Sequence, residues 1–245
     1  MTNFTRLPLK GSYNTRELGG CPTENGAINF HKFIRSDSIT ALTNQDLDFL
    51  KEYGLQTIID LRSEAEVAQA PNPQMEGVEN LHIPLITGDI ADATKDLGGF
   101  MKLTMGDFYI NVLKDYPQNL VKVFEAMADS QGAVLFHCSA GKDRTGIIAA
   151  FLLDLAGVSE ADIIANYQLT HTYLKTNPTY TKSASGYPQE MFYSLPSYME
   201  ELLSYLYQHY DSAENYLKTF GLSELAIENL REQLTGPILV SVKED

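Results

Sequence analysis

The segment from residue 132 to residue 157 constrains the fold more than any other part of the chain. It begins with the apolar run GAVLFH (132–137), which is typical of a buried strand. A second apolar run, from Arg144 to Ala156, has the length of a helix, and Gly157 is placed to end it. A buried strand that passes through a short loop into a buried helix is the repeating unit of α/β proteins. We therefore predict an α/β fold.

The rest of the chain alternates in the same way. TIIDLR (57–62) and NLHIPL (80–85) are predicted strands, and GAINFHKFIRS (26–36) has the alternation of a short hairpin. Helices are predicted after the capping residues Thr43, Ser63, Ser159 and Ser223, at 107–115, at 117–129 and from Pro196 onward. Alternating strands and helices predict a mainly parallel central sheet flanked by helices.

The length of 245 residues suits a single domain over 1–245. A helical, lid-like insertion is expected at about 172–212. Within it, residues 175–190 are rich in Pro, Ser, Thr and Gly and are predicted to be mobile. Residues 86–106 are expected to form a long loop.

Charge and composition exclude several classes of function. The net charge is −14, so the surface repels nucleic acid and anionic membranes, and neither is expected as a stable partner. No run approaches the ~20 apolar residues of a membrane span, and the first residues lack the apolar core of a signal peptide. A cytoplasmic location is expected, with secretion left open. No oligomeric state is predicted.

The chain has two cysteines, Cys21 and Cys138, which lie too far apart for a CxxC motif and form no disulfide framework. Its five histidines lack metal-ligand spacing. We therefore expect no metal and no cofactor.

The loop after the 132–137 strand carries the strongest chemical signal. Cys138 and Arg144 have a C-x5-R spacing between the strand and the predicted helix. Such a loop points backbone N–H groups into one concavity, and the helix N-terminus adds its positive dipole end, so the site binds anions. The same environment favours the thiolate of Cys138, which can attack phosphorus and form a phosphocysteine. The guanidinium of Arg144 can hold two phosphate oxygens.

The remaining loop residues are predicted to bind the phosphate; they are Ser139, Ala140, Gly141, Lys142, Thr145 and Gly146. The glycines permit tight turns and close approach of the backbone. Thr145 can donate its hydroxyl to the cysteine sulfur, which eases departure of the thiolate. The alternative is that Cys138 is a buried core thiol, as free cysteines usually are, but this leaves the basic and glycine residues around it unexplained.

The loop, HCSAGKDRTG, resembles that of the atypical bacterial protein tyrosine phosphatases, HCxxGKDRTG, within the cysteine-dependent phosphatase superfamily. NTRELGG (14–20) is similar to the family's NFRDLGG, although it departs at Thr15 and Glu17. IDLRSEAEV (59–67) is similar to DLRSxxE, and the C-terminal YLKTFGLSELAIENLREQL also matches. The resemblance implies the cysteine-dependent phosphatase fold and hydrolysis of phosphotyrosine, with phosphoserine, phosphothreonine and phosphoinositides as further substrates in some members.

The resemblance also places Arg16, Asp60 and Arg62 near the border of the pocket, although Asp60 and Arg62 can instead pair at a strand end, and Arg16 can anchor the N-terminal loop. A general acid must protonate the leaving oxygen. Without tryptophan the chain has no WPD motif, and Asp143 is favoured because the family carries an aspartate there. Asp143 could instead orient Arg144 or cap the helix. The other candidates for the general acid are Asp60, Asp89, Asp92 and Asp107.

Two other classes of function remain open from the sequence. One is a phosphate-binding module without catalysis, which retention of both Cys138 and Arg144 disfavours. The other is a C-x5-R enzyme of the rhodanese or arsenate-reductase type. This class is disfavoured because the chain has no well-placed second cysteine for redox chemistry. The expected substrate is a phosphorylated protein or a small phosphomonoester.

The substrate range is predicted from Lys142 and from the eight tyrosines between Tyr173 and Tyr210. Lys142 can pair with a second phosphate of an inositol ring, or it can simply be solvated. The tyrosines can form apolar walls for a substrate, or they can pack helices together. Phosphotyrosine is expected as the main substrate, with soluble phosphoinositides accepted as well.

Overall fold

The computed structural model describes residues 2–87, 104–178, 180 and 192–237. Its centre is a five-stranded sheet with the order β1-β4-β7-β5-β6. The strands are β1 (Arg16–Glu17), β4 (Phe33–Ser36), β5 (Leu55–Asp60), β6 (Glu79–His82) and β7 (Ala133–His137). All neighbours run parallel except β1, which is antiparallel to β4. The prediction of a mainly parallel sheet flanked by helices is confirmed.

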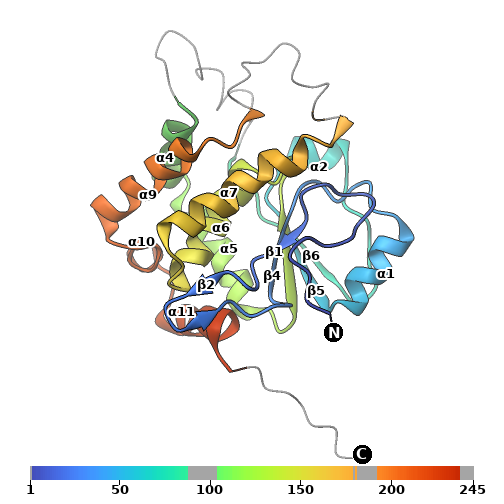
Figure 1. Cartoon of the computed structure of the whole chain (residues 1–245), viewed down its shortest axis with the longest axis horizontal. Helices are drawn as coiled ribbons and strands as arrows, with labels where there is room; N and C mark the ends of the chain where they lie inside the picture. The colour runs from blue at the N-terminus through green and yellow to red at the C-terminus, as the bar shows by residue number, and fades with distance from the viewer. Residues whose placement is uncertain (1, 88–103, 179, 181–191, 238–245) are drawn as a thin grey trace, which may run out of the picture.

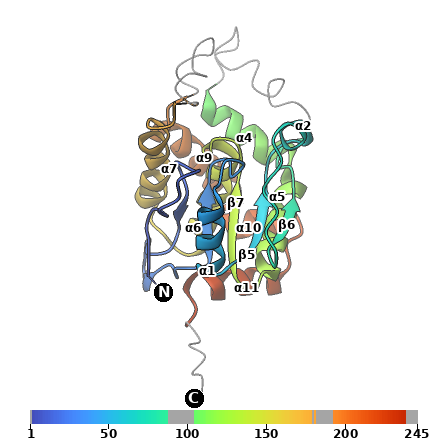
Figure 2. The same ribbon diagram turned by 90° about the vertical axis from the view of Figure 1, so that its right-hand side faces the viewer.

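Helices cover both faces of this sheet (Figures 1 and 2). One side carries α1 (Asn44–Glu52), and the other carries the layer that contains α6 (Asp143–Leu155) and α7 (Glu160–Leu174). The other helices in the described residues are α2 (Glu64–Gln69), α4 (Met105–Asp115), α5 (Pro117–Asp129), α9 (Pro196–Tyr210), α10 (Ala213–Thr219) and α11 (Glu224–Thr235).

The alternation of side chains along β7 explains the two layers. Val134 and Phe136 pack into the core on the α6 side, whereas Ala133 and Leu135 pack into the core on the α1 side. A strand buried on both faces requires the continuous apolar run that the sequence contains. The central position of β7 places the loop that follows it in the middle of the sheet edge.

The helix boundaries follow the predicted capping residues. Thr43 and Ser63 form capping boxes with Asp46 and Glu66, and Ser159 and Ser223 cap α7 and α11. Pro117 occupies the first turn of α5. Gly54 and Gly157 follow α1 and α6 with positive φ. These ends were readable from the sequence because each depends on local hydrogen bonds.

The predicted hairpin at 26–36 is wrong. Residues 26–27 form β3 (Gly26–Ala27), which pairs with β2 (Pro22–Thr23), whereas β4 pairs in parallel with β7, about a hundred positions later in the chain. Phe33 and Ile34 are adjacent and both fully buried, one in each of the two cores, so β4 is a strand buried on both faces and not a hairpin arm. Only tertiary packing distinguishes a central strand from a hairpin strand, because side chains alternate between the two faces with the same period in both.

The predicted insertion at 172–212 is described only in part. Within it, α9 packs against α4 and α7 and buries Met199, Leu202, Leu203 and Leu206. Most of the segment predicted to be mobile, 175–190, and most of the loop predicted at 86–106 lie outside the described residues. No described helix has the length and apolar character that crossing a membrane requires.

Candidate active site

Three parallel strands bring the site together. Ser36 of β4 and Asp60 of β5 both lie opposite His137 of β7 in the strand register. The carboxyl ends of these strands therefore meet at one level of the sheet, where ligands commonly bind in α/β proteins. Residues 138–142 follow β7 at this level, and α6 begins at Asp143.

The loop can close tightly because of Gly141. Its φ is +64°, and a Cβ atom at this position would lie 2.4 Å from the carbonyl oxygen of Ser36. A left-handed conformation and this close approach both require glycine. The predicted role of Gly141 in the turn therefore has a direct steric reason.

The loop's carbonyl groups are bound from behind. The Asn14 side-chain amide donates to the carbonyls of Ala140 (3.0 Å) and Gly141 (3.2 Å). Nη2 of Arg35 also donates to the Gly141 carbonyl, at 2.9 Å. The backbone N–H of Ser38 donates to the carbonyl of Ser139. With these carbonyls held on the outer side, the loop's N–H groups can face an anion in the concavity.

Cys138 lies at the base of the loop and is 2% exposed. The neighbouring His137 is fully buried, and its Nδ1 lies 3.1 Å from the Cys138 carbonyl. Burial lowers the pKa of His137 to about 4, although nearby Asp60 favours its charge. His137 is therefore neutral at physiological pH and anchors the strand end through hydrogen bonds rather than as a cation.

Arg144, in the first turn of α6, is held by Glu66. Its Nη1 and Nη2 donate to the two carboxylate oxygens of Glu66 at 2.7 and 3.0 Å, in a bidentate arrangement. Burial alone would raise the pKa of Glu66, but the hydrogen bond and charge of Arg144, with a hydrogen bond from Ser139, lower it to about 2. The carboxylate is thus ionised and fixes the plane of the guanidinium.

Sequence reasoning missed this function of Glu66. The pattern Ser63-x-x-Glu66 predicts a capping box, which the structure contains, and one Glu66 oxygen accepts from the Ser63 backbone at 2.9 Å. The same carboxylate also reaches Arg144 and Ser139. The available signal was that this glutamate ends the DLRSxxE-like motif.

Asp143 is the first residue of α6, and its side chain is 27% exposed. The Tyr109 hydroxyl donates to its Oδ1 at 2.6 Å, and the Tyr109 and Tyr167 hydroxyls are also 2.6 Å apart. Nζ of Lys142 lies 3.4 Å from the same Oδ1. The carboxyl group is therefore positioned beside the loop while part of it remains open to solvent.

Lys142 is not a solvated surface residue, because its side chain is 1% exposed. Its ammonium group contacts Asp143 and donates to the Tyr193 carbonyl at 3.3 Å. The buried lysine thus links the loop to the segment that precedes α9.

The rival aspartates that the structure describes are held in other bonds. Asp60 forms a buried ion pair with Arg62 at 2.7 Å and accepts from Asn72 at 3.0 Å. Asp107 accepts from the backbone N–H of Thr104 at the start of α4. Asp89 and Asp92 lie outside the described residues.

Arg16 lies behind the loop, and its Nη2 donates to the Asn166 carbonyl and the Thr170 hydroxyl. Arg62 pairs with Asp60 at the end of β5. Arg16 therefore anchors the segment around it, and Arg62 pairs with Asp60 at a strand end. These are the structural alternatives that the sequence left open.

The last two loop residues lie in the buried first turn of α6. The hydroxyl oxygen of Thr145 is buried and has no hydrogen-bond partner among the described residues. At Gly146 a Cβ atom would lie 3.3 Å from the Tyr167 ring and 3.8 Å from Nη2 of Arg35. The absence of a side chain at Gly146 therefore lets Tyr167 and Arg35 pack closely beneath the loop.

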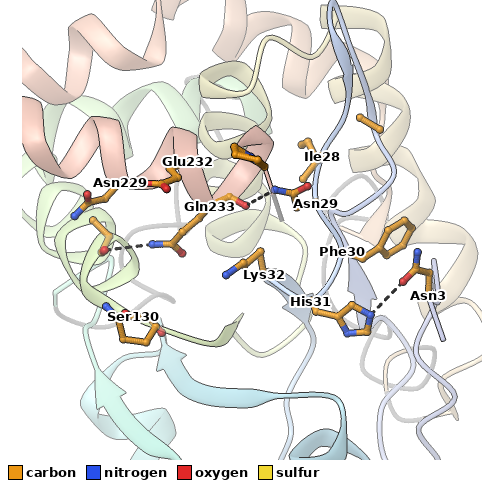
Figure 3. Close-up of a pocket in the computed structure, with 14 residues that line it drawn as sticks. Asn3, Ile28, Asn29, Phe30, His31, Lys32, Ser130, Asn229, Glu232 and Gln233 are labelled. Carbon is orange, nitrogen blue, oxygen red and sulfur yellow. Dashed lines mark hydrogen bonds between the residues drawn. The ribbon is translucent and has the colours of Figure 1, made fainter. Parts of the chain in front are cut away.

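A cavity of about 740 Å³ lies elsewhere, at the opposite end of the sheet (Figure 3). Its lining includes Lys32, just before β4, Ser130 and Gln131, just before β7, and Gln233 of α11. Figure 3 shows these side chains with the hydrogen bond from Asn29 to the Gln233 carbonyl. None of the predicted site residues lines this cavity, so it is separate from the loop.

Comparison with known proteins agrees with the chemistry of the loop. The model of the tyrosine phosphatase family matches residues 7–236. A tyrosine-protein phosphatase of Nostoc commune is 34% identical over 223 residues, which are 85% of this chain and 76% of that protein. The triple specificity protein phosphatase PtpB of Mycobacterium tuberculosis is 26% identical over 188 residues, which are 65% of this chain and 67% of that protein.

Proposed function

Because this chain belongs to the tyrosine phosphatase family and is a protein-tyrosine phosphatase, we propose that it hydrolyses phosphotyrosine monoesters through a phosphocysteine on Cys138. One observation carries the proposal. Cys138 is buried directly after β7, and Arg144, held by two hydrogen bonds to Glu66, lies in the first turn of the helix that follows. Nucleophile and phosphate clamp are thereby contributed by one rigid strand–loop–helix unit.

In the first step the Cys138 thiolate forms a bond to phosphorus while the bond from phosphorus to the phenolic oxygen breaks. The electron pair goes to the leaving oxygen, which takes a proton from Asp143. Arg144 and the loop N–H groups stabilise the charge on the three remaining phosphoryl oxygens. Arg144 still has N–H donors for this, because Glu66 engages only one edge of its planar group.

In the second step water attacks the phosphocysteine, and the sulfur leaves as a thiolate. Asp143, now ionised, accepts the proton of the water. The hydrogen bond from the Tyr109 hydroxyl holds the Asp143 carboxyl group in one place for both proton transfers. The products are inorganic phosphate and the free phenol.

Phosphotyrosine is the main proposed substrate, within a protein or in a small phosphomonoester. The name of the Mycobacterium tuberculosis relative describes triple specificity for that protein. For this chain, hydrolysis of phosphoserine, phosphothreonine and soluble phosphoinositides is a prediction. Lys142 is the residue to test, because its ammonium group is held by Asp143 and Tyr193 and would have to reach a ring phosphate from there.

The test is turnover of para-nitrophenyl phosphate and of a phosphotyrosine peptide by the wild type, Cys138→Ser and Cys21→Ser. We expect Cys138→Ser to lose turnover while it still binds inorganic phosphate, since Arg144 and the loop backbone remain. Cys21→Ser should keep its rate, which a two-cysteine reductase mechanism would not allow. A chelator should leave the wild-type rate unchanged. A Cys138→Ser variant with a near-wild-type rate would disprove the proposal.

A further inference from the structure

Two arginines, Arg16 and Arg35, are buried side by side behind the phosphate loop. They are paired in the antiparallel register of β1 and β4, and they are 0% and 1% exposed. Residues directly opposite in such a register share one face of the sheet. Both therefore extend toward α7, where Nη2 of Arg16 donates to Thr170 at 2.9 Å and Nη1 of Arg35 donates to the Asn166 side chain at 2.8 Å.

Neither guanidinium has a carboxylate partner among the residues that the structure describes. Every acceptor of their hydrogen bonds is a neutral oxygen from an amide, a carbonyl or a hydroxyl. In the part of the chain that the structure describes, no acidic oxygen lies within 4.0 Å of either group. The Nε atom of each is buried without a hydrogen-bond partner. Burying a cation without an acid is costly, so an unseen counter-charge is expected.

The surrounding ionisable groups narrow the choice of that counter-charge. Burial lowers the pKa of Arg35 to about 10, and four anionic forms would oppose this; they belong to Cys138, Tyr167, Tyr109 and Cys21, in decreasing order of effect. Burial raises the pKa of both tyrosines well above the usual range and also raises the pKa of Cys21. These three groups are therefore neutral at physiological pH.

The remaining charged neighbours do not change this result. The Tyr173 ring, whose centre lies 5.6 Å from Cζ of Arg16, and Asp37 both favour the charge of Arg16. The Asp37 carboxylate accepts from Ser12 and from the backbone of Tyr13 and Asn14. On the loop, Asp143 is engaged by Lys142. Of the anionic forms that favour the charge of Arg35, that of Cys138 has the largest effect, and the same form favours the charge of Arg144.

Arg35 also touches the loop. Its Nη2 donates to the Gly141 carbonyl at 2.9 Å and approaches the first turn of α6 at Gly146. It thus fixes the loop backbone and holds a positive charge beneath it. A chain with a net charge of −14 needs such a local positive field to attract an anion.

We propose that Arg35, with Arg16 beside it, is a positioning residue whose counter-charge is the anion in the loop: the Cys138 thiolate in the free enzyme and the phosphate in the complex. This rests on the proposed function of Cys138 as the nucleophile. Arg35 does not contact the substrate. It acts through the Gly141 carbonyl and through its charge, which favours an anion in the loop.

The experiment measures the rate at which iodoacetamide alkylates Cys138 in the full chain, with Cys21→Ser as background so that one thiol is present. The variants are Arg35→Met, which removes the charge, and Arg35→Lys, which keeps it. Arg6→Gln removes the same charge from the surface and is the matched control. Rates are compared at pH 6 and pH 9, and folding is checked by circular dichroism.

We expect Arg35→Met to react about tenfold or more slowly than the background protein at pH 6 and at a similar rate at pH 9, where an ordinary thiol is already largely ionised. Arg35→Lys should stay within about threefold, and Arg6→Gln should not change. Inorganic phosphate should raise the melting temperature of Arg35→Met less than that of the background protein.

Three results would overturn the proposal: an unchanged rate in Arg35→Met at pH 6, an equal slowing at both pH values, or an Arg35→Lys variant that is slowed tenfold. If Arg35→Met does not fold, Arg35→Lys decides alone by the same criterion. Alkylation does not require turnover. Failure of this proposal is therefore distinct from failure of the nucleophile assignment, which Cys138→Ser tests by turnover.

Discussion

On the β5 side of the central strand a buried arginine faces a carboxylate, whereas on the β4 side the described acceptors of a buried arginine are all neutral oxygens. Arg62 is 2% exposed, and its Nε and Nη2 donate to Asp60 at 2.9 and 2.7 Å. Arg35 is 1% exposed and bonds to Asn166 and Gly141 instead. The loop lies between them, after β7.

Under our proposal, the same buried residue type serves stability on one side of the site and anion binding on the other. The charge of Arg62 is neutralised within the fold, so it closes the end of β5 and adds little field to the loop. The charge of Arg35 is not neutralised by a carboxylate, so it remains available to an anion. Burial alone does not reveal which role an arginine has; its acceptors do.

The largest expected effect comes from removing the paired arginine. Arg62→Met should lower the free energy of unfolding by about 3–5 kcal/mol, because it leaves the Asp60 carboxylate buried and unpaired. Arg35→Met should lower the free energy of unfolding clearly less, because it removes a cation that has no acid partner in the described part of the chain. Urea unfolding of both variants at pH 7 measures this difference. An equal or larger loss in Arg35→Met would contradict the comparison.

Within the loop, Asp143 provides the next test. If it is the acid, Asp143→Asn should slow a poor leaving group such as phenyl phosphate by about 10²-fold, and an activated aryl phosphate far less. The basic limb of the pH–rate profile should flatten. Asp107→Asn is the control, since Asp107 caps α4, and should leave the ratio of the two substrates unchanged. A uniform loss in Asp143→Asn with an unchanged profile would assign it a structural role.

The smallest effect concerns Glu17, the neighbour of Arg16 on β1. Successive strand residues face opposite sides, so Glu17 cannot neutralise Arg16. It is buried, which raises its pKa from the ordinary value of 4.5 to about 7, and its Oε1 accepts from the His31 backbone at 2.8 Å. The folded state therefore keeps a proton that the unfolded state has lost between these two pH values.

The pKa shift of Glu17 makes the stability of the fold depend on pH. The favourable contribution of neutral Glu17 is complete below pH 4.5 and is lost as the pH rises through about 7. Glu17→Gln should therefore stabilise the protein at pH 8 by about 1–2 kcal/mol and have little effect at pH 4. Unfolding curves at the two pH values measure this. A variant that is less stable than the wild type at pH 8 would mean that Glu17 is ionised with an unrecognised partner.

Local features of this fold and site could be predicted from the sequence. The caps at Thr43 and Ser159 and the loop between β7 and α6 depend on residues a few positions apart, and all are present. The loop's motif also identified the family before any geometry was known.

Features that depend on contacts between distant segments could not be predicted. Parallel pairing of β4 with β7 replaced the expected hairpin. Glu66 lies 78 positions before Arg144, and Arg35 lies 106 positions before Gly141. Burial of Lys142 likewise depends on packing of the loop against the segment before α9. Charged residues are expected at the surface by default, so their burial is visible only in the folded chain.

The measurement that tests the central claim most directly is capture of the covalent intermediate. Wild-type protein is mixed with an aryl phosphate, quenched in acid within milliseconds and digested, and the peptide that contains residues 132–144 is analysed by mass spectrometry. A phosphoryl group on Cys138 that forms and decays at rates consistent with turnover is the predicted result, with none in Cys138→Ser. Turnover without any phosphorylated cysteine, or with the phosphoryl group on another residue, would contradict the account.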